Sequence, residues 1–278
     1  MFGTSRKFVT SETLPGLRWE NGAERPSRDV VASETAVALV YNGMPHVVMM
    51  ATPEYIEDFV LGFSLSEGVI RTVDEFRGVR VRELADGIEA DISIAEAPFR
   101  ELEKKQRNLT GRVGCGLCGA QTLAQAIRHP RAVADTLRLP PESLHRALSG
   151  IESKQRLNAA TGAVHAAAWV DVDGNIALAR EDVGRHNALD KLIGAMVPAK
   201  TSFAGGAALI TSRASYEMIQ KAAMVGIQVV CAISAPTSLA VRLAEETGVT
   251  LVAFARGTRH TVYAHGSRIA ACAESEAA

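Results

Sequence analysis

The feature that most constrains the fold is an alternation of apolar runs and helix-like segments in the second half of the chain. From residue 163 onward, apolar runs of strand length are interleaved with segments whose apolar residues recur at helical spacing. This alternation is typical of α/β proteins, in which several parallel strands are covered by helices. The expected strands span 164–170, 176–180, 207–211, 228–233 and 250–254, and the expected helices lie near 184–196, 214–225 and 236–247.

The first half of the chain predicts a smaller α+β unit. Two strands, 36–41 and 47–50, are expected to form a hairpin because the dipeptide between them, Asn42-Gly43, favours a tight turn. Thr52-Pro53 predicts an N-cap and a first-turn proline for a helix that runs to about Ser66. Two further strands are expected at 78–83 and 87–95.

The predicted fold is therefore α/β, with a layered C-terminal domain and a smaller N-terminal α+β domain. Before the first strand, Pro15, Gly16, Gly22 and Pro26 interrupt any regular period and predict an irregular segment. The expected segments are an irregular lead-in at 1–34, the α+β domain at 35–98, a flexible Cys-x-x-Cys loop and connector at 99–150, the α/β domain at 151–270 and a tail at 271–278.

The balance of charges argues against a protein that binds duplex nucleic acid. The 30 Lys and Arg residues face 31 Asp and Glu residues, for a formal net charge of -1, whereas binding through counterion release favours a basic excess. No apolar stretch approaches the ~20 residues that span a bilayer, and residues 1–21 lack the apolar core of a signal peptide. We therefore expect a cytoplasmic protein with no nucleic-acid and no membrane partner.

The central chemical feature is the run Gly114-Cys115-Gly116-Leu117-Cys118-Gly119. A thiolate is a good nucleophile only when it is deprotonated and accessible, and flanking glycines leave both sulfurs unshielded. Arg107 and Arg112 are hypothesised to supply positive potential that lowers a thiol pKa. The other two cysteines differ, because Cys231 lies in an apolar run and is expected to be an inert core thiol, and Cys272 lies in the small-residue tail.

A Cys-x-x-Cys pair alone is compatible with three kinds of site. A structural zinc site needs two more ligands, and Cys231 and Cys272 do not form a second close pair, while His129 and His145 stand at unremarkable spacings. A thioredoxin-like pair should follow a strand and open a helix, but here the preceding residues are charged and non-periodic. The third possibility is a sulfur carrier, in which a persulfide on one cysteine travels on a loop between donor and acceptor. The position in a tether favours this third possibility.

Several polar residues follow the predicted strands, where α/β proteins commonly bind anions. His165 opens a strand ahead of three alanines, which would let a ligand approach closely, although the residue alone slightly favours a core histidine on a strand. Arg185 and His186 begin a predicted helix that Asp182 is expected to cap, and His186 and Asp190 stand one turn apart on a face that simple solvation would also explain. Ser212, Arg213 and Ser215 and the run 234–238 follow the next two strands, and their hydroxyls suit either phosphate ligands or ordinary N-caps. The run 254–259 follows the last predicted strand, and its two arginines, glycine and aromatic ring fit a bound base and phosphate.

Taken in order, these motifs resemble the formate dehydrogenase accessory sulfurtransferase (FdhD) family. The similarity runs from about residue 30 to about residue 269, nearly the whole chain. The matching segments are Thr52-Pro53 through Glu67-Gly68, the Gly-Cys-Gly-Leu-Cys-Gly run, Thr161-Gly-x-x-His165-Ala-Ala-Ala, Glu181-Asp-Val-Gly-Arg-His-Asn-Ala-Leu-Asp-Lys191, Ser212-Arg-Ala-Ser-Tyr-Glu-Met218 and Ser234-Ala-Pro-Thr-Ser-Leu-Ala240.

The resemblance implies a persulfide carrier that serves molybdenum- or tungsten-dependent formate dehydrogenases. Sulfur would come from a cysteine desulfurase and pass to the bis-guanine-dinucleotide form of the molybdenum cofactor, a bound substrate, with no stably bound metal of the protein's own. Cys115 would hold the persulfide and Cys118 would assist. The residues implied to bind the cofactor are Phe254, Ala255, Arg256, Gly257, Thr258 and Arg259, joined by His165, Arg185, His186, Ser212 and Arg213 from the strand ends.

The resemblance also implies a larger domain similar in fold to cytidine deaminases, and a homodimer. The chain lacks the His-x-Glu and Pro-Cys-x-x-Cys zinc signature, so deamination itself is not expected. Two other functions stay open. One is a chaperone that holds the cofactor or the client enzyme without moving sulfur, and the other is a structural protein stabilised by zinc.

Overall fold

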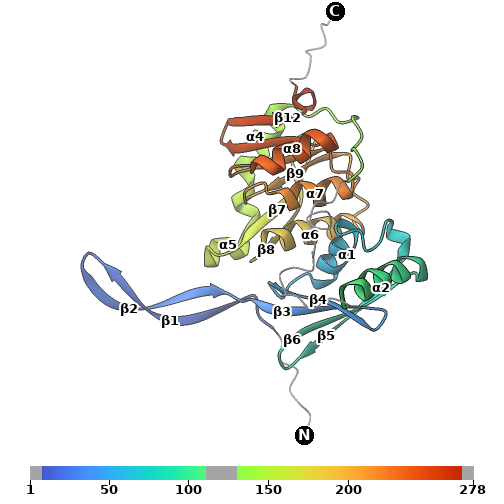
Figure 1. The fold of residues 1–278 in the computed structure, drawn as a ribbon. Coiled ribbons are helices and arrows are strands. Elements are labelled where there is room, and N and C mark those ends of the chain that lie inside the picture. The colour runs from blue at the N-terminus through green and yellow to red at the C-terminus, as the bar shows by residue number, and fades with distance from the viewer. Residues whose placement is uncertain (1–7, 111–129, 271–278) are drawn as a thin grey trace, which may run out of the picture.

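The computed structural model describes residues 8–110 and 130–270, and for residues 107–110 it describes the backbone alone. Figure 1 shows a lower body built on a four-stranded sheet, an upper body built on a six-stranded sheet, and a long two-stranded arm that projects to the left. The predicted α/β fold with a smaller N-terminal α+β part is confirmed. Within the described ranges, no helix is both long enough and apolar enough to cross a membrane.

The four-stranded sheet holds the strands predicted for the first half of the chain. They are β3 (Thr35–Tyr41), β4 (Met44–Ala51), β5 (Phe76–Leu84) and β6 (Gly87–Ile94), in the order β4-β3-β6-β5. Asn42 and Gly43 form the predicted turn and have φ values of 47° and 82°, so both adopt the left-handed conformation that such dipeptides accommodate. One face of the sheet packs against α1 (Ile56–Ser66) through Val37, Leu39, Ile92 and Phe59.

Two predictions for the first half are wrong in detail. The helix that Thr52-Pro53 was expected to open begins at Ile56, with Tyr55 at the N-cap position, because Thr52 is fully buried and bonded to another part of the chain. The connector expected to be flexible from residue 99 begins as α2 (Glu96–Thr110), where Leu102 is buried and Glu96 pairs with Arg100 one turn later. A short 3-10 helix, η1 (Val73–Glu75), precedes β5.

The lead-in expected to be irregular is also different. Residues 8–10 precede a regular hairpin, the arm, which consists of β1 (Ser11–Glu20) and β2 (Ala23–Ala32) paired antiparallel over their whole length. Pro15 and Pro26 do not prevent pairing because both strands are edge strands, in which one row of backbone groups has no neighbour. The prediction of irregularity over 1–34 is therefore wrong for residues 11–32. The rest of the five-segment division stays a prediction.

The six-stranded sheet is mixed. Its order is β12-β11-β10-β9-β7-β8, with β9, β10 and β11 parallel to one another and the outer strands antiparallel. The strands are β7 (His165–Asp171), β8 (Ile176–Asp182), β9 (Gly206–Ile210), β10 (Val229–Ala232), β11 (Thr250–Arg256) and β12 (Arg259–Ala264), so five of the six match predicted strands.

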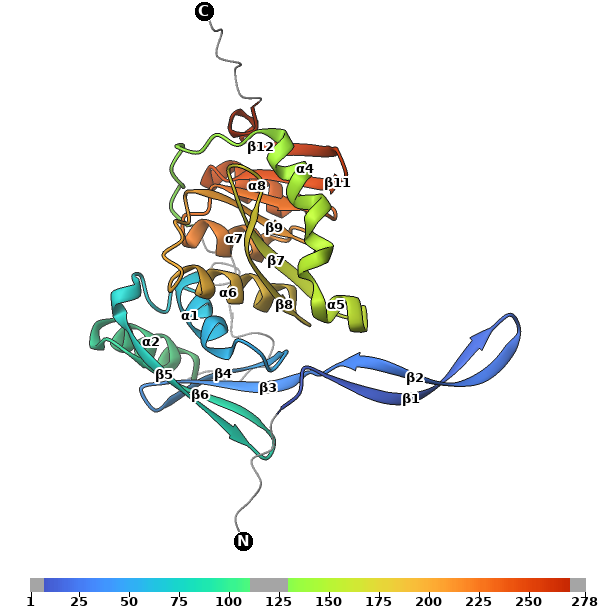
Figure 2. The ribbon, with the colours of Figure 1, turned by 180° about the vertical axis from the view of Figure 1, so that it is seen from behind.

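Helices cover both faces of this sheet, as Figures 1 and 2 show from opposite sides. On one face, the side chains of Trp169, Ile210 and Val230 join a core that continues into the lower body. On the other face, Val170, Leu209 and Cys231 pack with Leu144 and Leu148 of α4. The helices are α4 (Pro141–Gly150), α5 (Arg156–Thr161), α6 (Arg185–Met196), α7 (Tyr216–Met224) and α8 (Ser238–Thr247), with 3-10 turns η2 (Ile151–Lys154) and η3 (Gly266–Arg268).

The two bodies meet where α1 lies against α6 at very short range. A Cβ atom added to Gly62 would lie 1.7 Å from the Asp190 carbonyl oxygen, and one added to Gly194 would lie 1.8 Å from the Asp58 carbonyl oxygen. Glycine is therefore required at both positions. Next to this contact, Arg180 of β8 pairs with Asp58 at 2.8 Å and lies over the Tyr55 ring.

A buried ion pair fixes the connection between β4 and α6. The Asp182 carboxylate and the Lys191 ammonium are 2.6 Å apart, and both side chains are fully buried. Lys191 donates to the Thr52 carbonyl at 2.9 Å, Thr52 N–H donates to Asp182 at 3.0 Å, and Val183 N–H donates to the Thr52 hydroxyl at 3.1 Å. Asn187 completes the set by donating to Asp182 and to the Met50 carbonyl. Burial lowers the pKa of Lys191, and the Asp182 charge counteracts that effect.

A second buried cluster joins α1, α6 and α7. Lys221 donates to both carboxylate oxygens of Asp190 at 3.0 and 2.9 Å and pairs with Glu67 at 2.8 Å. Ser66 donates to Asp190 at 2.6 Å. Burial raises the pKa of Asp190 to about 6, against the opposing effects of Lys221 and Ser66. The solvated face considered for Asp190 from the sequence is therefore wrong, because this residue is 1% exposed.

We predict that Lys191→Met destabilises the protein by about 3–5 kcal/mol, because Asp182 would keep a buried charge without its partner. Urea titration of the variant and the wild type, followed by circular dichroism, gives the difference in unfolding free energy. The matched control is Lys154→Met, which removes an exposed lysine from η2 and should change stability by less than about 0.5 kcal/mol. Equal effects of the two substitutions would contradict the structural role of the pair.

Candidate functional site

The topology of the six-stranded sheet brings the predicted site residues to one edge. The parallel strands β9, β10 and β11 all end there, and β7 begins and β8 ends there because β7 is antiparallel to both of its neighbours. We call this the carboxyl edge. It collects His165, the run 182–186, the run 211–213, the run 234–237 and the run 254–259, which are the segments singled out in the sequence.

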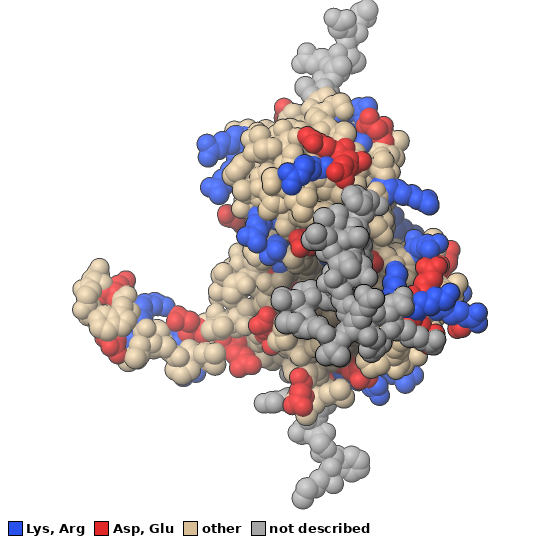
Figure 3. Space-filling view, viewed as in Figure 1, with Lys and Arg blue, Asp and Glu red and all other residues tan. Residues whose placement is uncertain are grey.

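Positive charge gathers at the carboxyl edge. Arg213, Arg256 and Arg259 are exposed there, and Arg185 is half-buried. In Figure 3, Lys and Arg side chains lie along the left side of the upper body, the side on which β11 turns into β12 in Figure 1. The local excess stands out in a chain whose formal net charge is -1. An anion of several charges is the kind of ligand that such an edge attracts.

The start of α6 supplies backbone donors at this edge. Gly184 is the N-cap residue and makes no side-chain capping bond, so the expectation that Asp182 caps the helix is wrong. Instead, Asp182 accepts the Gly184 N–H at 2.8 Å from the end of β8. The first N–H groups of a helix have no partner within the helix and carry partial positive charge, which suits an anion.

Two buried polar atoms beside the start of α6 have no hydrogen-bond partner among the described residues. They are Nε of Arg185 and Nε2 of His186. A buried polar atom without a partner is costly, and in a native structure a water, an ion or a ligand can supply the missing hydrogen bond. The pair therefore fits a ligand with acceptor oxygens bound at the carboxyl edge.

Both histidines of the edge are held in the neutral form. Burial, the adjacent Arg185 and Lys221 lower the pKa of His186 to about 4, although Glu217 and Glu67 partly oppose this. Burial and Arg185 also lower the pKa of His165, which is half-buried at the start of β7. A neutral imidazole can accept or donate a proton according to the ligand that approaches it.

Glu217 faces His186 from α7. Its carboxylate is 3.8 Å from His186 Nε2 and accepts a hydrogen bond from the Ser215 hydroxyl at 2.8 Å. Burial opposes its ionisation, but hydrogen bonds from its own backbone N–H and from Ser215 lower its pKa overall, with help from His186 and Arg185. The sequence did not single out Glu217 as a site residue, although it lies within a segment that carries the family resemblance.

Three hydroxyl groups at the strand ends make hydrogen bonds within the protein. Thr237 is the N-cap of α8 and accepts the Ala240 N–H at 3.2 Å, so the ordinary capping role holds for this residue. Thr211 accepts the Ala166 N–H at 2.9 Å and thereby joins β9 to β7. Ser212 is 4% exposed and donates to the Arg213 carbonyl at 3.2 Å, so its hydroxyl is buried and already bonded.

The run 254–259 spans the end of β11, a two-residue turn and the first residue of β12. Phe254 is 46% exposed with a φ of 51°, and its ring lies 6.4 Å from that of Tyr263. Gly257 has a φ of 56°, and Thr258 is exposed beside it. Ala255 is fully buried in the core that α4 covers. A side-chain contact from Ala255 to a ligand is therefore excluded, and a contact through its backbone stays a prediction.

The two cysteines expected to carry the chemistry, Cys115 and Cys118, lie outside the described residues, as do Arg112 and Cys272. Cys231 is fully buried in β10, and burial raises the pKa of its thiol to about 12. It is thus the inert core thiol that the sequence predicted. Within residues 8–110 and 130–270, no three His, Cys, Asp or Glu side chains stand close enough to hold a metal ion.

A pair of histidines beside the carboxyl edge could not be predicted from the sequence. His260 at the start of β12 and His145 of α4 are hydrogen-bonded, with Nδ1 and Nε2 3.0 Å apart. Burial and the neighbouring His145 lower the pKa of His260. The two residues are 115 positions apart, so no local pattern could signal the pair.

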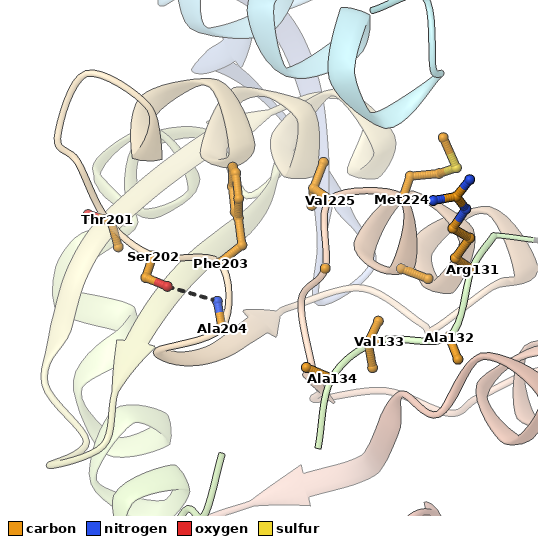
Figure 4. Close-up of a pocket in the computed structure, with 12 residues that line it drawn as sticks. Arg131, Ala132, Val133, Ala134, Thr201, Ser202, Phe203, Ala204, Met224 and Val225 are labelled. Carbon is orange, nitrogen blue, oxygen red and sulfur yellow. Dashed lines mark hydrogen bonds between the residues drawn. The ribbon is translucent and has the colours of Figure 1, made fainter. Parts of the chain in front are cut away.

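A cavity of about 570 Å³ lies away from the predicted site, at the opposite edge of the six-stranded sheet. It is lined by the segments 131–134, 201–204 and 223–226, which precede β9 and β10. Figure 4 shows Phe203, Val225, Val133 and Met224 around it, together with the bond from Ala204 N–H to the Ser202 hydroxyl. Its side chains are mostly small or apolar and carry a single charge, Arg131. None of the predicted site residues lines it.

Known proteins match this chain over most of its length. A sulfur carrier protein FdhD from Cupriavidus necator is 46% identical over 260 residues, which is 94% of this chain and 90% of that protein. A sulfur carrier protein FdhD from Bordetella bronchiseptica is 49% identical over 243 residues, covering 87% of this chain and 88% of that protein.

A solved structure and a family profile agree with these relatives. The crystal structure from Desulfotalea psychrophila, assigned to the formate dehydrogenase accessory proteins, has the same fold with a TM-score of 0.74. It is 24% identical and covers 94% of this chain and 100% of that one. The profile of the FdhD/NarQ family matches residues 32–270, from the end of the arm to the end of the described chain. The chain therefore belongs to the FdhD/NarQ family.

Proposed function

We propose that this chain is a sulfur carrier for the maturation of formate dehydrogenases. Persulfide sulfur passes from a cysteine desulfurase to Cys115, and from Cys115 to the molybdenum or tungsten bis-guanine-dinucleotide cofactor held at the carboxyl edge. The printed names of the relatives support the sulfur-carrier role. The assignment of Cys115 and Cys118 rests on the Cys-x-x-Cys motif and its flanking glycines.

The observation that carries the cofactor half of the proposal is the chemistry of the carboxyl edge. Four arginines converge there with the start of α6 and with two buried atoms that have no hydrogen-bond partner among the described residues. A bis-guanine dinucleotide carries two pyrophosphates, which planar guanidinium groups and helix N-termini bind well. Phe254, exposed next to Arg256, offers a ring against which a guanine base can stack.

The sulfur transfer is written as two exchanges. The Cys115 thiolate attacks the outer sulfur of the desulfurase persulfide, so that the desulfurase thiolate leaves and Cys115 becomes the persulfide. The Cys118 thiolate then attacks the Cys115 sulfur, which releases the outer sulfur as sulfide for the metal and leaves a Cys115–Cys118 disulfide. A cellular dithiol is needed to reduce that disulfide before the next cycle. In this scheme the protein is a sulfurtransferase.

The remaining expectations belong to the same proposal. The partners are a cysteine desulfurase, a formate dehydrogenase and the guanine-containing cofactor. The protein acts in the cytoplasm as a homodimer. The rival is a chaperone that binds the cofactor or the client without moving sulfur. The two functions differ in one observable, because only a carrier gains sulfur on a cysteine.

We predict that Cys115→Ala abolishes sulfur loading and leaves the fold intact. Intact-protein mass spectrometry after incubation with a desulfurase and free cysteine should show an added sulfur, removed by reductant, in the wild type and not in the variant. Cys272→Ala is the matched control and should load normally, and peptide mapping should find Cys231 unmodified because its buried thiol stays protonated. Normal loading of Cys115→Ala would overturn the proposed role of this residue.

We predict that Arg256→Ala and Arg259→Ala each weaken the binding of GDP by about tenfold, or 1.4 kcal/mol, because each removes a charge-assisted contact to phosphate. Isothermal titration calorimetry measures the affinity. Arg242→Ala is the control, since Arg242 is an exposed arginine of α8 and not of the carboxyl edge. Unchanged affinity in both edge variants would remove the run 254–259 from the binding site.

We also predict that, at low pH, His186 takes up a proton when GDP binds. The pKa of His186 is about 4 in the free protein, and a bound phosphate raises it, so the bound form protonates at a higher pH than the free form. The wild-type affinity, measured relative to that of His186→Asn at the same pH, should therefore rise as the pH is lowered from 7.5 to 5.5. Calorimetry in buffers of different ionisation enthalpy measures the uptake, which His186→Asn should reduce. A pH profile that is the same in the wild type and in His186→Asn would show that His186 does not face the phosphate.

A further inference from the structure

The hydrogen-bonded pair of His145 and His260 ties α4 to the start of β12. Nε2 of His145 and Nδ1 of His260 are 3.0 Å apart, and the planes of the two rings are inclined by 50°. Both residues are half-buried. A neutral imidazole has one N–H donor and one acceptor nitrogen, so two neutral rings can share one bond. The pair is therefore a direct link between a covering helix and an outer strand of the sheet.

The sheet itself fixes α4, the helix that carries His145. One side of α4 is buried against the strands. The Ser143 hydroxyl donates to the Val172 carbonyl at 2.6 Å. One turn along, Arg146 donates to the Asp173 carbonyl at 2.7 Å. Both carbonyls belong to the turn between β7 and β8, so the bond from His145 reaches β12 from a helix with its own attachments to the sheet.

The start of β12 has fewer backbone restraints than an inner strand of the sheet. β12 is the outermost strand, and among the described strands only β11 pairs with it. The two strands are joined by the turn 257–258, in which Gly257 has a φ of 56°. Their register shifts between Ala253 and Arg256, close to the turn, and such a shift leaves part of the ladder unpaired. A contact outside the ladder can therefore decide where the first residues of β12 lie.

Two arginines stand directly opposite each other across this turn. Arg256 and Arg259 are partners in the ladder, and both are exposed. Opposite residues of an antiparallel pair share one face of the sheet, and like charges in that position destabilise the pairing. His260 follows Arg259, so its side chain leaves the opposite face, where it meets His145. The bond between the histidines therefore restrains the backbone next to Arg259 against this repulsion.

We propose that His145 is a positioning residue of the carboxyl edge, which acts through His260 on Arg259. The bond keeps the two opposed guanidinium groups close enough together to bind one pyrophosphate, which offsets their mutual repulsion. The inference rests on the proposed function, since it takes Arg259 to contact the phosphates of a guanine nucleotide. It adds to the site a residue of α4, a helix that carries none of the site residues predicted from the sequence.

Three substitutions at position 145 separate positioning from simple packing. The amide of a glutamine reaches about as far as Nε2 of histidine, whereas that of an asparagine reaches only as far as Nδ1. His145→Gln should therefore keep the bond to His260 and bind GDP as the wild type does. His145→Asn and His145→Ala should each weaken GDP binding about fivefold, the usual net effect of one hydrogen bond. Isothermal titration calorimetry measures these affinities.

A double-mutant cycle tests the route through Arg259. Arg259→Ala alone should weaken GDP binding about tenfold. Adding His145→Ala to that variant should weaken binding no further, because the group that the bond positions is then absent. The matched control is His265→Ala, which removes an exposed histidine that follows the other end of β12 and should leave the affinity unchanged.

Hydrogen–deuterium exchange on the nucleotide-free protein gives a readout that does not depend on GDP. The amides of residues 257–262 should exchange about fivefold faster in His145→Ala than in the wild type and in His145→Gln, while those of β10 keep their rates. Unchanged exchange at 257–262, wild-type affinity in His145→Asn, or an effect of His145→Ala that persists without Arg259 would each overturn the proposal. A wild type that binds no GDP would instead overturn the proposed cofactor site, and this inference with it.

Discussion

The buried pair of Asp182 and Lys191 is the interaction on which the rest of the structure depends. It sits where β8 ends, where α6 begins and where the chain leaves β4 at Thr52, so three elements from both bodies meet at one carboxylate. A buried pair costs desolvation energy, which good geometry and additional hydrogen bonds must offset. Here Thr52, Gly184 and Asn187 supply those bonds. The position of α6, and with it the donors at the carboxyl edge, follows from this arrangement.

The run from Glu181 to Lys191 serves two purposes that the sequence could not separate. Asp182, Asn187, Asp190 and Lys191 face inward and hold the bodies together, whereas Arg185 and His186 lie at the edge. The sequence grouped them by spacing along a helix, but their roles are set by partners such as Ser66 and Lys221, which are 124 and 31 residues from Asp190. Long-range pairing of this kind leaves no local signal.

Periodicity and apolar runs predicted most strands and helices because burial imposes them: residues of β3 alternate between buried and half-buried, and every residue of β9 is buried. They failed for the arm, whose strands bury almost nothing and contain Pro15 and Pro26, so that neither alternation nor composition indicated pairing. The capping signal misplaced the start of α1. Thr52-Pro53 has the composition of a helix start, but the Thr52 N–H is bonded to Asp182 instead. The edge itself was predictable, because parallel strands end together. The buried side chain of Ala255 and the approach of Glu217 to His186 were not.

The most direct measurement is hydrogen–deuterium exchange on Asp182→Ala compared with the wild type. If the carboxylate holds the edge in place, the amides of Thr52, Val183 and Gly184, which form the hydrogen-bonded junction, should exchange at least tenfold faster, a loss of about 1.4 kcal/mol of local protection. The amides of Val230 and Cys231 in β10 should keep their wild-type rates. Unchanged exchange at the three junction amides would contradict the account, because the edge would then be held by something other than Asp182.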